Sequence, residues 1–373
     1  MLSVRIARCC KHLLTTSVAI EWSLRMTILI LDLRRAGTPE CGPQGAGCLS
    51  VAARLRRAAY AFATFLAMLV VATGAHAWPE RPVTVIVPYS AGGNTDTMAR
   101  MASEWLSVQL KQRFVVENRV GAGGTIAAAF VAQSKPDGYT LLFGAAPQLL
   151  IAPLIQKVSY DARKDFAPVA VFGTGPHVMA VHASVPGKTI GDFITYAKAN
   201  PGKVNYASGG QGTSGHLHAA LFASRAGLDM VHVPYRGGAP ATADLLAGQV
   251  QMYFGNAAEL LPHIGSDKIR LILVSSARRM PQLPDAPTLE ELFPGFKLPP
   301  WNGFLAPAAT PKPILELLAK ETVAATKNPA IVQRLSDLGI EPGGPMLDGF
   351  QKDIDQSRSA FEDAVKAAGL KPM

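Results

Sequence analysis

The chain has 373 residues, 49% of them hydrophobic, which leaves room for about two domains that each bury a core. Its formal net charge is +9, but nine of the 36 basic and three of the 27 acidic residues lie in the first 77 positions. The remainder therefore carries a net charge of only +3 and gives little support for nucleic-acid binding. All four cysteines also lie in those positions, which excludes disulfides and thiol catalysis from the rest of the chain.

The N-terminal segment predicts an export signal. Three arginines between positions 54 and 57 precede the apolar run 58–72, and an A-x-A cleavage site ends at Ala77. The run has 15 residues, fewer than the roughly 20 that a membrane-spanning helix needs. We therefore expect a periplasmic protein whose signal peptide is removed after Ala77, so that Trp78 becomes the N-terminus.

Residues 1–50 precede everything that a signal peptide requires. We interpret them as an over-long N-terminus, because translation from near Val51 would give a leader of ordinary length. The whole of 1–77 is thus assigned to a leader that takes no part in the folded domains.

The stretch 83–100 predicts a strand, a glycine turn and a helix start. Val83–Val87 is a β-branched run of strand length, and Gly92 and Gly93 allow a tight turn with positive φ. The residues at 94–96 are types that begin helices. A helix start presents free backbone N–H groups and the positive end of the helix dipole, so this turn is a candidate anion cradle.

A second cradle of the same kind lies at 203–222, which reads KVNYASGGQGTSGHLHAALF. One strand-to-helix turn is weak evidence, because every α/β protein contains several. Two similar turns a domain apart predict two lobes that hold one anion between them.

The rest of the chain alternates between strand and helix patterns, which predicts an α/β fold. The expected strands are Phe114–Glu117, Tyr139–Gly144, Val169–Phe172, Val178–Val181, Met230–Pro234, Gln249–Phe254 and Ile269–Ser275. The expected helices are Gly123–Ser134, Ile190–Ala199, Ala239–Ala247, Pro311–Lys327, Ala330–Leu338 and Leu347–Ala368. Ile269–Ser275 is almost wholly apolar, as expected of a buried parallel strand, whereas the proline-rich stretch 280–300 is typical of a loop.

The second cradle also contains a dinucleotide-binding pattern. Gly210–Gly215 reads G-x-G-x-x-G between a strand and a helix, and Arg236 after the next strand could read a 2′-phosphate. An exported protein has no NADPH available, and the motif opens no nucleotide-binding domain of its own. An NADP-binding enzyme is therefore kept only as an alternative.

No set of residues assembles a catalytic or metal centre in the sequence. Ser214 lacks the G-x-S-x-G setting of a hydrolase nucleophile. His216 and His218 are two positions apart, so on a helix they diverge by about 200° and cannot bind one ion. We expect no enzyme activity, no cofactor and no metal.

Six segments together carry a family likeness: PYSAGGNTDTMAR, VVENRVGAGG, KPDGYTLL, NYASGGQGTSGHL, VHVPYRGGAPA and LPDAPTLEEL. In this order and spacing they resemble the substrate-binding proteins of tripartite tricarboxylate transporters, called the TctC or Bug family. The resemblance covers the chain from about Trp78 onward. It implies a periplasmic receptor that captures a small carboxylated metabolite and delivers it to the membrane subunits of a tripartite transporter.

The resemblance also implies a two-lobed, periplasmic-binding-protein-like fold. Each lobe would be a mostly parallel sheet flanked by helices, and two crossing strands would join the lobes, near Val178–His182 and Pro300–Leu305. We accordingly assign 78–178 and 300–373 to lobe 1 and 179–299 to lobe 2. We expect a monomer that binds no nucleic acid. A sensory module that presents its ligand to a membrane kinase would use the same cleft and remains the rival interpretation.

Ligand-binding residues are expected beyond the carboxyl ends of the strands, where the two cradles would pinch a ligand carboxylate through backbone N–H groups and water. They are Tyr89, Ser90, Ala91, Gly92, Gly93, Asn94, Thr95, Asp96, Ala145, Gln148, Ser208, Gly209, Gly210, Gln211, Gly212, Thr213, Ser214, Tyr235 and Asn256. Two positions depart from the family's pattern: Asn94 replaces a small residue or proline, and Gly255 replaces a frequent aspartate. Both lie where ligand specificity would be set.

Overall fold

The computed structural model describes residues 78–373 except 277, 296–297 and 371–373. The predicted signal peptide and the residues before it lie outside the described residues. Within the described part of the chain, no helix combines the length and the apolar character needed to cross a membrane.

One mixed sheet has six strands in the order β11-β4-β10-β3-β1-β2. Its strands are β1 (Val83–Val87), β2 (Phe114–Asn118), β3 (Thr140–Ala145), β4 (Phe166–Thr174), β10 (Asn302–Pro307) and β11 (Glu341–Pro342). The central β1 is apolar because it is covered on both faces, and it pairs in parallel with β2 and β3. β10 runs antiparallel to both of its neighbours, β3 and β4.

A second sheet has five strands in the order β7-β6-β8-β5-β9. Its strands are β5 (His177–His182), β6 (Val204–Ser208), β7 (Met230–Pro234), β8 (Met252–Asn256) and β9 (Ile269–Val274). β6 pairs in parallel with β7 and β8, whereas β5 is antiparallel to β8 and β9.

The predicted α/β class with two sheets is confirmed, but the sheets are less parallel than predicted. β9 is an antiparallel edge strand, so the expectation of a buried parallel strand at Ile269–Ser275 is wrong. An apolar composition indicates that a strand is buried, but it does not indicate whether the strand runs parallel or antiparallel to its neighbours. β5 follows β4 after only Gly175 and Pro176, and the two strands lie in different sheets. The chain therefore enters the second sheet at His177, one residue before the predicted crossing at Val178–His182.

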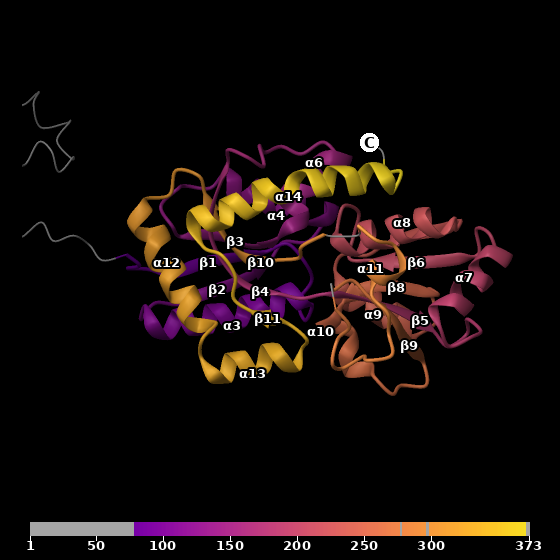
Figure 1. Ribbon diagram of the computed structural model, residues 1–373. Helices are drawn as coiled ribbons and strands as arrows, with labels where there is room; N and C mark the ends of the chain where they lie inside the picture. The colour runs from indigo at the N-terminus through magenta and orange to yellow at the C-terminus, as the bar shows by residue number, and fades with distance from the viewer. Residues whose placement is uncertain (1–77, 277, 296–297, 371–373) are drawn as a thin grey trace, which may run out of the picture. The chain divides into compact units, whose positions relative to one another are not determined.

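Helices cover both sheets (Figure 1). The long or site-forming ones are α3 (Asn94–Gln109), α4 (Thr125–Ala132), α5 (Ala146–Leu150), α6 (Ala152–Ile155), α7 (Ile190–Ala199), α8 (Ser214–Ala226), α9 (Gly238–Leu246), α10 (Ala257–Leu260), α12 (Lys312–Ala325), α13 (Pro329–Asp337) and α14 (Leu347–Ala367). The described residues also contain the short helix α11 (Leu289–Leu292) and two 3-10 helices, η1 (Ala122–Gly124) and η2 (Leu261–His263).

α11 interrupts the stretch 280–300, which the proline content had indicated as a loop. Thr288 caps it by accepting a hydrogen bond from the Glu291 N–H at 3.0 Å. The T-x-x-E spacing of these two residues is a helix-start signal that the proline content obscured.

The core lies on both faces of the sheets. α3, α12 and α13 pack on one face of the six-stranded sheet, and α9 and α10 pack on one face of the five-stranded sheet. A third cluster joins the remaining faces and includes Phe350 and Phe361 of α14. With 21 residues α14 is about 31 Å long, so it reaches from β4 to α8, where the Ser224 hydroxyl donates to the Ala367 carbonyl at 2.7 Å.

Candidate functional site

The first cradle forms the start of α3, and its two glycines differ. Gly92 has a φ of 81°, in the region that favours glycine, whereas Gly93 has a φ of −77°. The prediction of positive φ at both positions is therefore wrong for Gly93. A Cβ at Gly93 would lie 3.5 Å from Oε1 of Glu259, an ordinary van der Waals contact, so neither φ nor space requires glycine at this position.

Asp96 faces away from the centre of the site. Its carboxylate accepts hydrogen bonds from the Gly92 N–H at 2.9 Å, from Arg100 Nε at 2.9 Å and from Asn118 Nδ2 at 2.9 Å. Burial works against ionisation, but these hydrogen bonds outweigh it and hold the pKa of Asp96 below its usual value. Asp96 thus fixes the turn before α3 and has no carboxylate oxygen to spare for a ligand.

The second cradle forms the start of α8. Gly210 has a φ of 126°, and its carbonyl accepts from the Thr213 hydroxyl at 2.7 Å. Thr213 caps the helix and accepts from the His216 N–H at 3.4 Å. The first N–H groups of α8, those of Ser214 and Gly215, take no part in intrahelical hydrogen bonds and remain available.

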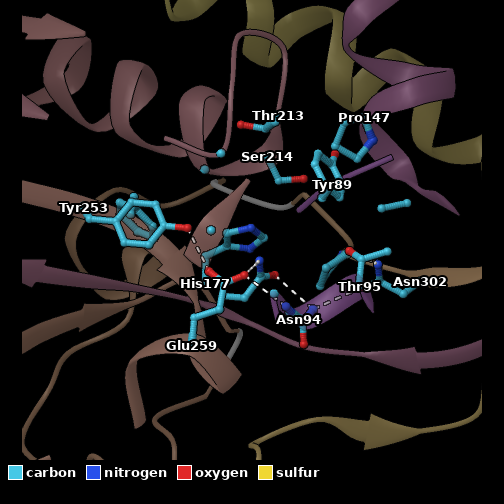
Figure 2. Close-up of a pocket in the computed structure, with 18 of the residues that line it drawn as sticks. Tyr89, Asn94, Thr95, Pro147, His177, Thr213, Ser214, Tyr253, Glu259 and Asn302 are labelled. Atoms are coloured by element: carbon cyan, nitrogen blue, oxygen red, sulfur yellow. Dashed lines mark hydrogen bonds between the residues drawn. The ribbon is translucent and has the colours of Figure 1, made fainter. Parts of the chain in front are cut away.

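A cavity of about 50 Å³ lies where these two helix starts meet (Figure 2). Besides α3 and α8, the starts of α5 and α9 border it. Its lining residues are Tyr89, Gly93, Asn94, Thr95, Ala145, Pro147, His177, Gly209, Thr213, Ser214, Gly215, Gly238, Tyr253, Phe254, Asn256, Glu259, Pro300, Trp301 and Asn302. None of these described residues is a lysine or an arginine, so helix N-termini supply the positive potential.

Nine of the residues predicted from the sequence line this cavity. They are Tyr89, Gly93, Asn94, Thr95, Ala145, Gly209, Thr213, Ser214 and Asn256. The two cradles, more than 110 positions apart in the sequence, are therefore brought to one place.

The other ten predicted residues do not line it. They are Ser90, Ala91, Gly92, Asp96, Gln148, Ser208, Gly210, Gln211, Gly212 and Tyr235. Ala91, Gly92 and Asp96 line a separate hollow beside Arg100. The sequence places all of these residues at strand ends but does not say toward which side each one points.

Gln148 and Ser208 do not line the cavity, but they form hydrogen bonds to residues that line it or to the turns that carry those residues. Gln148 is fully buried; its Oε1 accepts from the Ala145 N–H at 2.8 Å, and its Nε2 donates to the Tyr89 hydroxyl at 2.8 Å. The Ser208 hydroxyl lies 2.7 Å from Nε2 of His232 and accepts from the Gly210 N–H at 3.1 Å. Both side chains therefore position cavity-lining residues or their turns and do not face the cavity themselves.

The dinucleotide pattern opens onto a different surface. Gly210, Gln211, Tyr235 and Arg236 line a wider hollow of about 480 Å³ together with the glycine-rich η1. Gly215, the last glycine of the pattern, allows α8 to pack closely on β8, because a Cβ there would lie only 2.3 Å from the Phe254 carbonyl oxygen. This glycine is required by the close contact of α8 with β8, which explains it without a nucleotide.

Asparagines link the two sheets across the cavity. Nδ2 of Asn94 lies 3.3 Å from Oδ1 of Asn256 and 3.5 Å from Oδ1 of Asn302. Nδ2 of Asn302 in turn donates to the Thr95 hydroxyl at 3.0 Å. The departure from the family's pattern at Asn94 thus creates a side chain that contacts both lobes.

Two residues that line the cavity, Glu259 and His177, were not predicted from the sequence. Glu259 projects from α10 to the start of α3, where Oε1 accepts from the Asn94 N–H at 3.1 Å. Oε2 accepts from the Tyr253 hydroxyl at 2.8 Å, and Asn256 Nδ2 lies 3.3 Å from Oε1. Burial raises the pKa of Glu259, although these donors favour its charged form.

His177, the first residue of β5, is buried beside the cavity, and within the described chain its Nδ1 has no hydrogen-bond partner. Its ring centroid lies 4.8 Å from that of His218 on α8. Burial and the neighbouring ring hold the pKa of His177 well below its usual value, so this histidine is neutral. The cavity therefore has no cationic side chain.

Comparison with known proteins identifies the family. Residues 98–369 match the family described as "Tripartite tricarboxylate transporter family receptor". The chain belongs to this family. A relative from Pseudomonas sp. (strain P51), the UPF0065 protein in the tcbD-tcbE intergenic region, is 39% identical over 270 residues, which are 72% of this chain and 80% of the relative.

Solved structures of similar receptors share this fold. R. palustris Rpa4515 with adipate is 34% identical and superposes with a TM-score of 0.76, over 79% of this chain and all of Rpa4515. MatC from Rhodopseudomonas palustris with bound malate is 32% identical with a TM-score of 0.74, over 77% of this chain and all of MatC. Family members are periplasmic receptors, and this chain has their two-sheet architecture.

Proposed function

We propose that this family member is a periplasmic receptor that captures a small carboxylate and delivers it to the membrane subunits of a tripartite transporter. The proposal rests on one observation: α3 and α8, which start beside different sheets, both have their N-termini at the same cavity. Similar receptors hold adipate and malate, which supports a carboxylate as the ligand.

The ligand carboxylate would be held by backbone N–H groups. Those of Thr95, Ser214 and Gly215 lie in the first turns of α3 and α8 and border the cavity. A hydrogen bond to a charged group contributes about 1.5–3 kcal/mol, and a micromolar complex needs about 8 kcal/mol in all. Three such bonds and close packing therefore account for micromolar binding without a salt bridge.

The proposed receptor acts as a monomer without enzyme activity. Because it is exported, it begins at Trp78 after removal of the signal peptide. N-terminal sequencing of periplasmic material tests the cleavage site: a mature protein that keeps the apolar run 58–72 would contradict it.

Calorimetry with malate, adipate and related acids tests the function itself. Wild-type protein should bind at least one of these acids. Gly210→Val should abolish that binding, because Gly210 has a positive φ and a Cβ there would lie 3.1 Å from the Tyr235 carbonyl. Arg236→Gln is the control: Arg236 lies outside the cavity, so its loss should change affinity less than tenfold.

A wild-type protein that binds none of the acids would contradict the proposal. So would loss of binding in Arg236→Gln with normal binding in Gly210→Val, since the carboxylate would then be held by a salt bridge.

A further inference from the structure

Glu259 is the one carboxylate among the described residues that line the cavity. It belongs to the five-stranded lobe, yet its Oε1 accepts from the Asn94 N–H at the start of α3, on the other lobe. Tyr253 and Asn256 hold its position from the same lobe. Glu259 is half-buried and lines the cavity, so a bound ligand would contact it.

The two ends of the cavity differ in hydrogen-bonding character. The starts of α3 and α8 offer N–H donors from Thr95, Ser214 and Gly215. The end at α10 offers acceptors: the Glu259 carboxylate and Oδ1 of Asn94, which is buried and has no partner among the described residues. A carboxylate fits the first end, and a hydrogen-bond donor fits the second.

A dicarboxylate meets a difficulty at the second end. Its second carboxylate would face Glu259 without a lysine, an arginine or a charged histidine to separate the two negative charges. Like charges in a partly buried site repel, and the second ligand carboxylate would lose its water there without gaining a cationic partner among the described lining residues. An amide or an ammonium group placed there would instead donate to Glu259.

We infer that Glu259 selects a ligand that carries one carboxylate and, at its other end, an amide or ammonium donor, in preference to a dicarboxylate of the same length. This inference rests on the proposed function, because the α8 end must first bind a carboxylate. It distinguishes this protein from the receptors whose structures hold adipate and malate.

Protonation of Glu259 would remove the repulsion, and burial raises the pKa of this carboxyl. A protonated Glu259 could donate to a second ligand carboxylate, which would reverse the preference. The experiment below therefore has opposite outcomes for the two states.

The test compares dicarboxylates with their half-amides, which have nearly the same shape: succinate with succinamate, and adipate with adipamate. Calorimetry at pH 7.5 should show the half-amide binding at least tenfold tighter to the wild-type protein. In Glu259→Gln the ratio should fall below threefold, because the glutamine amide is neutral and both donates and accepts. Asp229→Asn removes the same charge from an exposed position of the same lobe and should leave the ratio unchanged.

Equal or tighter binding of the dicarboxylate by the wild-type protein would overturn the inference, as would a ratio that Glu259→Gln does not alter. If Glu259→Gln does not fold, Glu259→Asp keeps the charge and should keep the preference, so its loss would also overturn the inference. If no acid of either kind binds, the proposed function itself fails. Binding of the dicarboxylates alone refutes only the selectivity.

Discussion

At the scale of single residues, the site contains ionisable side chains that the fold keeps neutral. His177 and His218 are both buried, with 6% and 2% of their surfaces exposed, and burial is the main cause of their lowered pKa values. For His218 the pKa falls from 6.5 to about 4, and its ring stacks on Phe254 with a centroid distance of 5.3 Å. Neutral rings at this position keep the cavity free of cationic side chains.

This burial predicts a loss of stability in acid. Between pH 6.5 and about 4 the unfolded chain binds a proton at His218 that the folded protein does not accept, so stability falls as the pH falls. At pH 5 the loss from one such histidine is about 2 kcal/mol. His218→Phe should reduce the difference in unfolding free energy between pH 7 and pH 5 by about that amount, as measured by urea denaturation.

If His218→Phe lost as much stability between pH 7 and pH 5 as the wild-type protein, His218 would not be the buried neutral group described above.

At the scale of secondary-structure elements, the helix starts were predictable and the cavity-facing side chains of other elements were not. Strand, glycine turn and capping residues follow one another in α3 and α8, so local chemistry indicates both anion cradles. Glu259 follows Asn256 by three positions, a spacing that suggests a local helix cap. Glu259 does contact Asn256, but its Oε1 also accepts from the N–H of Asn94, 165 positions away, and no sequence pattern encodes so distant a contact.

Whether a strand pairs parallel or antiparallel could not be predicted from the sequence either. An apolar run such as β9 shows that a strand is buried, but parallel and antiparallel pairing bury the same side chains. Among the named strands β9 pairs only with β5, and no local pattern within β9 records that this pairing is antiparallel.

The packing of α8 on β8 gives an element-scale prediction. Gly215→Ala should destabilise the protein by more than about 2 kcal/mol, because a Cβ would approach the Phe254 carbonyl oxygen to 2.3 Å and backbone cannot give way cheaply. Gly349→Ala in α14 is the matched control. Its nearest neighbour would be Pro345 Cβ at 3.7 Å, so it should be neutral or stabilising by up to about 1 kcal/mol.

Thermal and urea denaturation of the two alanine variants would show this contrast. Equal stability of the two variants would mean that α8 does not approach β8 as closely as described.

At the scale of the whole described protein, few segments join the lobes. The link at 175–176 and the segment 275–301 connect the two sheets, and α14 reaches across to α8. At about 50 Å³ the cavity is smaller than the roughly 300–1,000 Å³ of most small-molecule sites, so a ligand as large as adipate needs the lobes to separate before it can enter. Such a ligand should then favour the closed arrangement, because it contacts both lobes at once.

Small-angle scattering should therefore show a smaller radius of gyration when the tightest-binding acid is added at saturation. Glu259 and Asn94 already join the lobes by a hydrogen bond, and the ligand would add contacts in the same place. Identical scattering profiles with and without saturating ligand would argue against closure.

The central claim is that backbone N–H groups at a helix start hold the ligand carboxylate, and one pair of substitutions at Ser214 tests it directly. Ser214 is the first residue of α8, and Thr213 before it has φ −81° and ψ 161°, a conformation that a following proline permits. Ser214→Pro removes the N–H while the helix can still form, and Ser214→Ala removes only the hydroxyl. With the tightest-binding acid, calorimetry should show at least tenfold weaker binding for Ser214→Pro and a change below threefold for Ser214→Ala. Wild-type affinity in a folded Ser214→Pro protein would show that the α8 N–H groups do not hold the carboxylate.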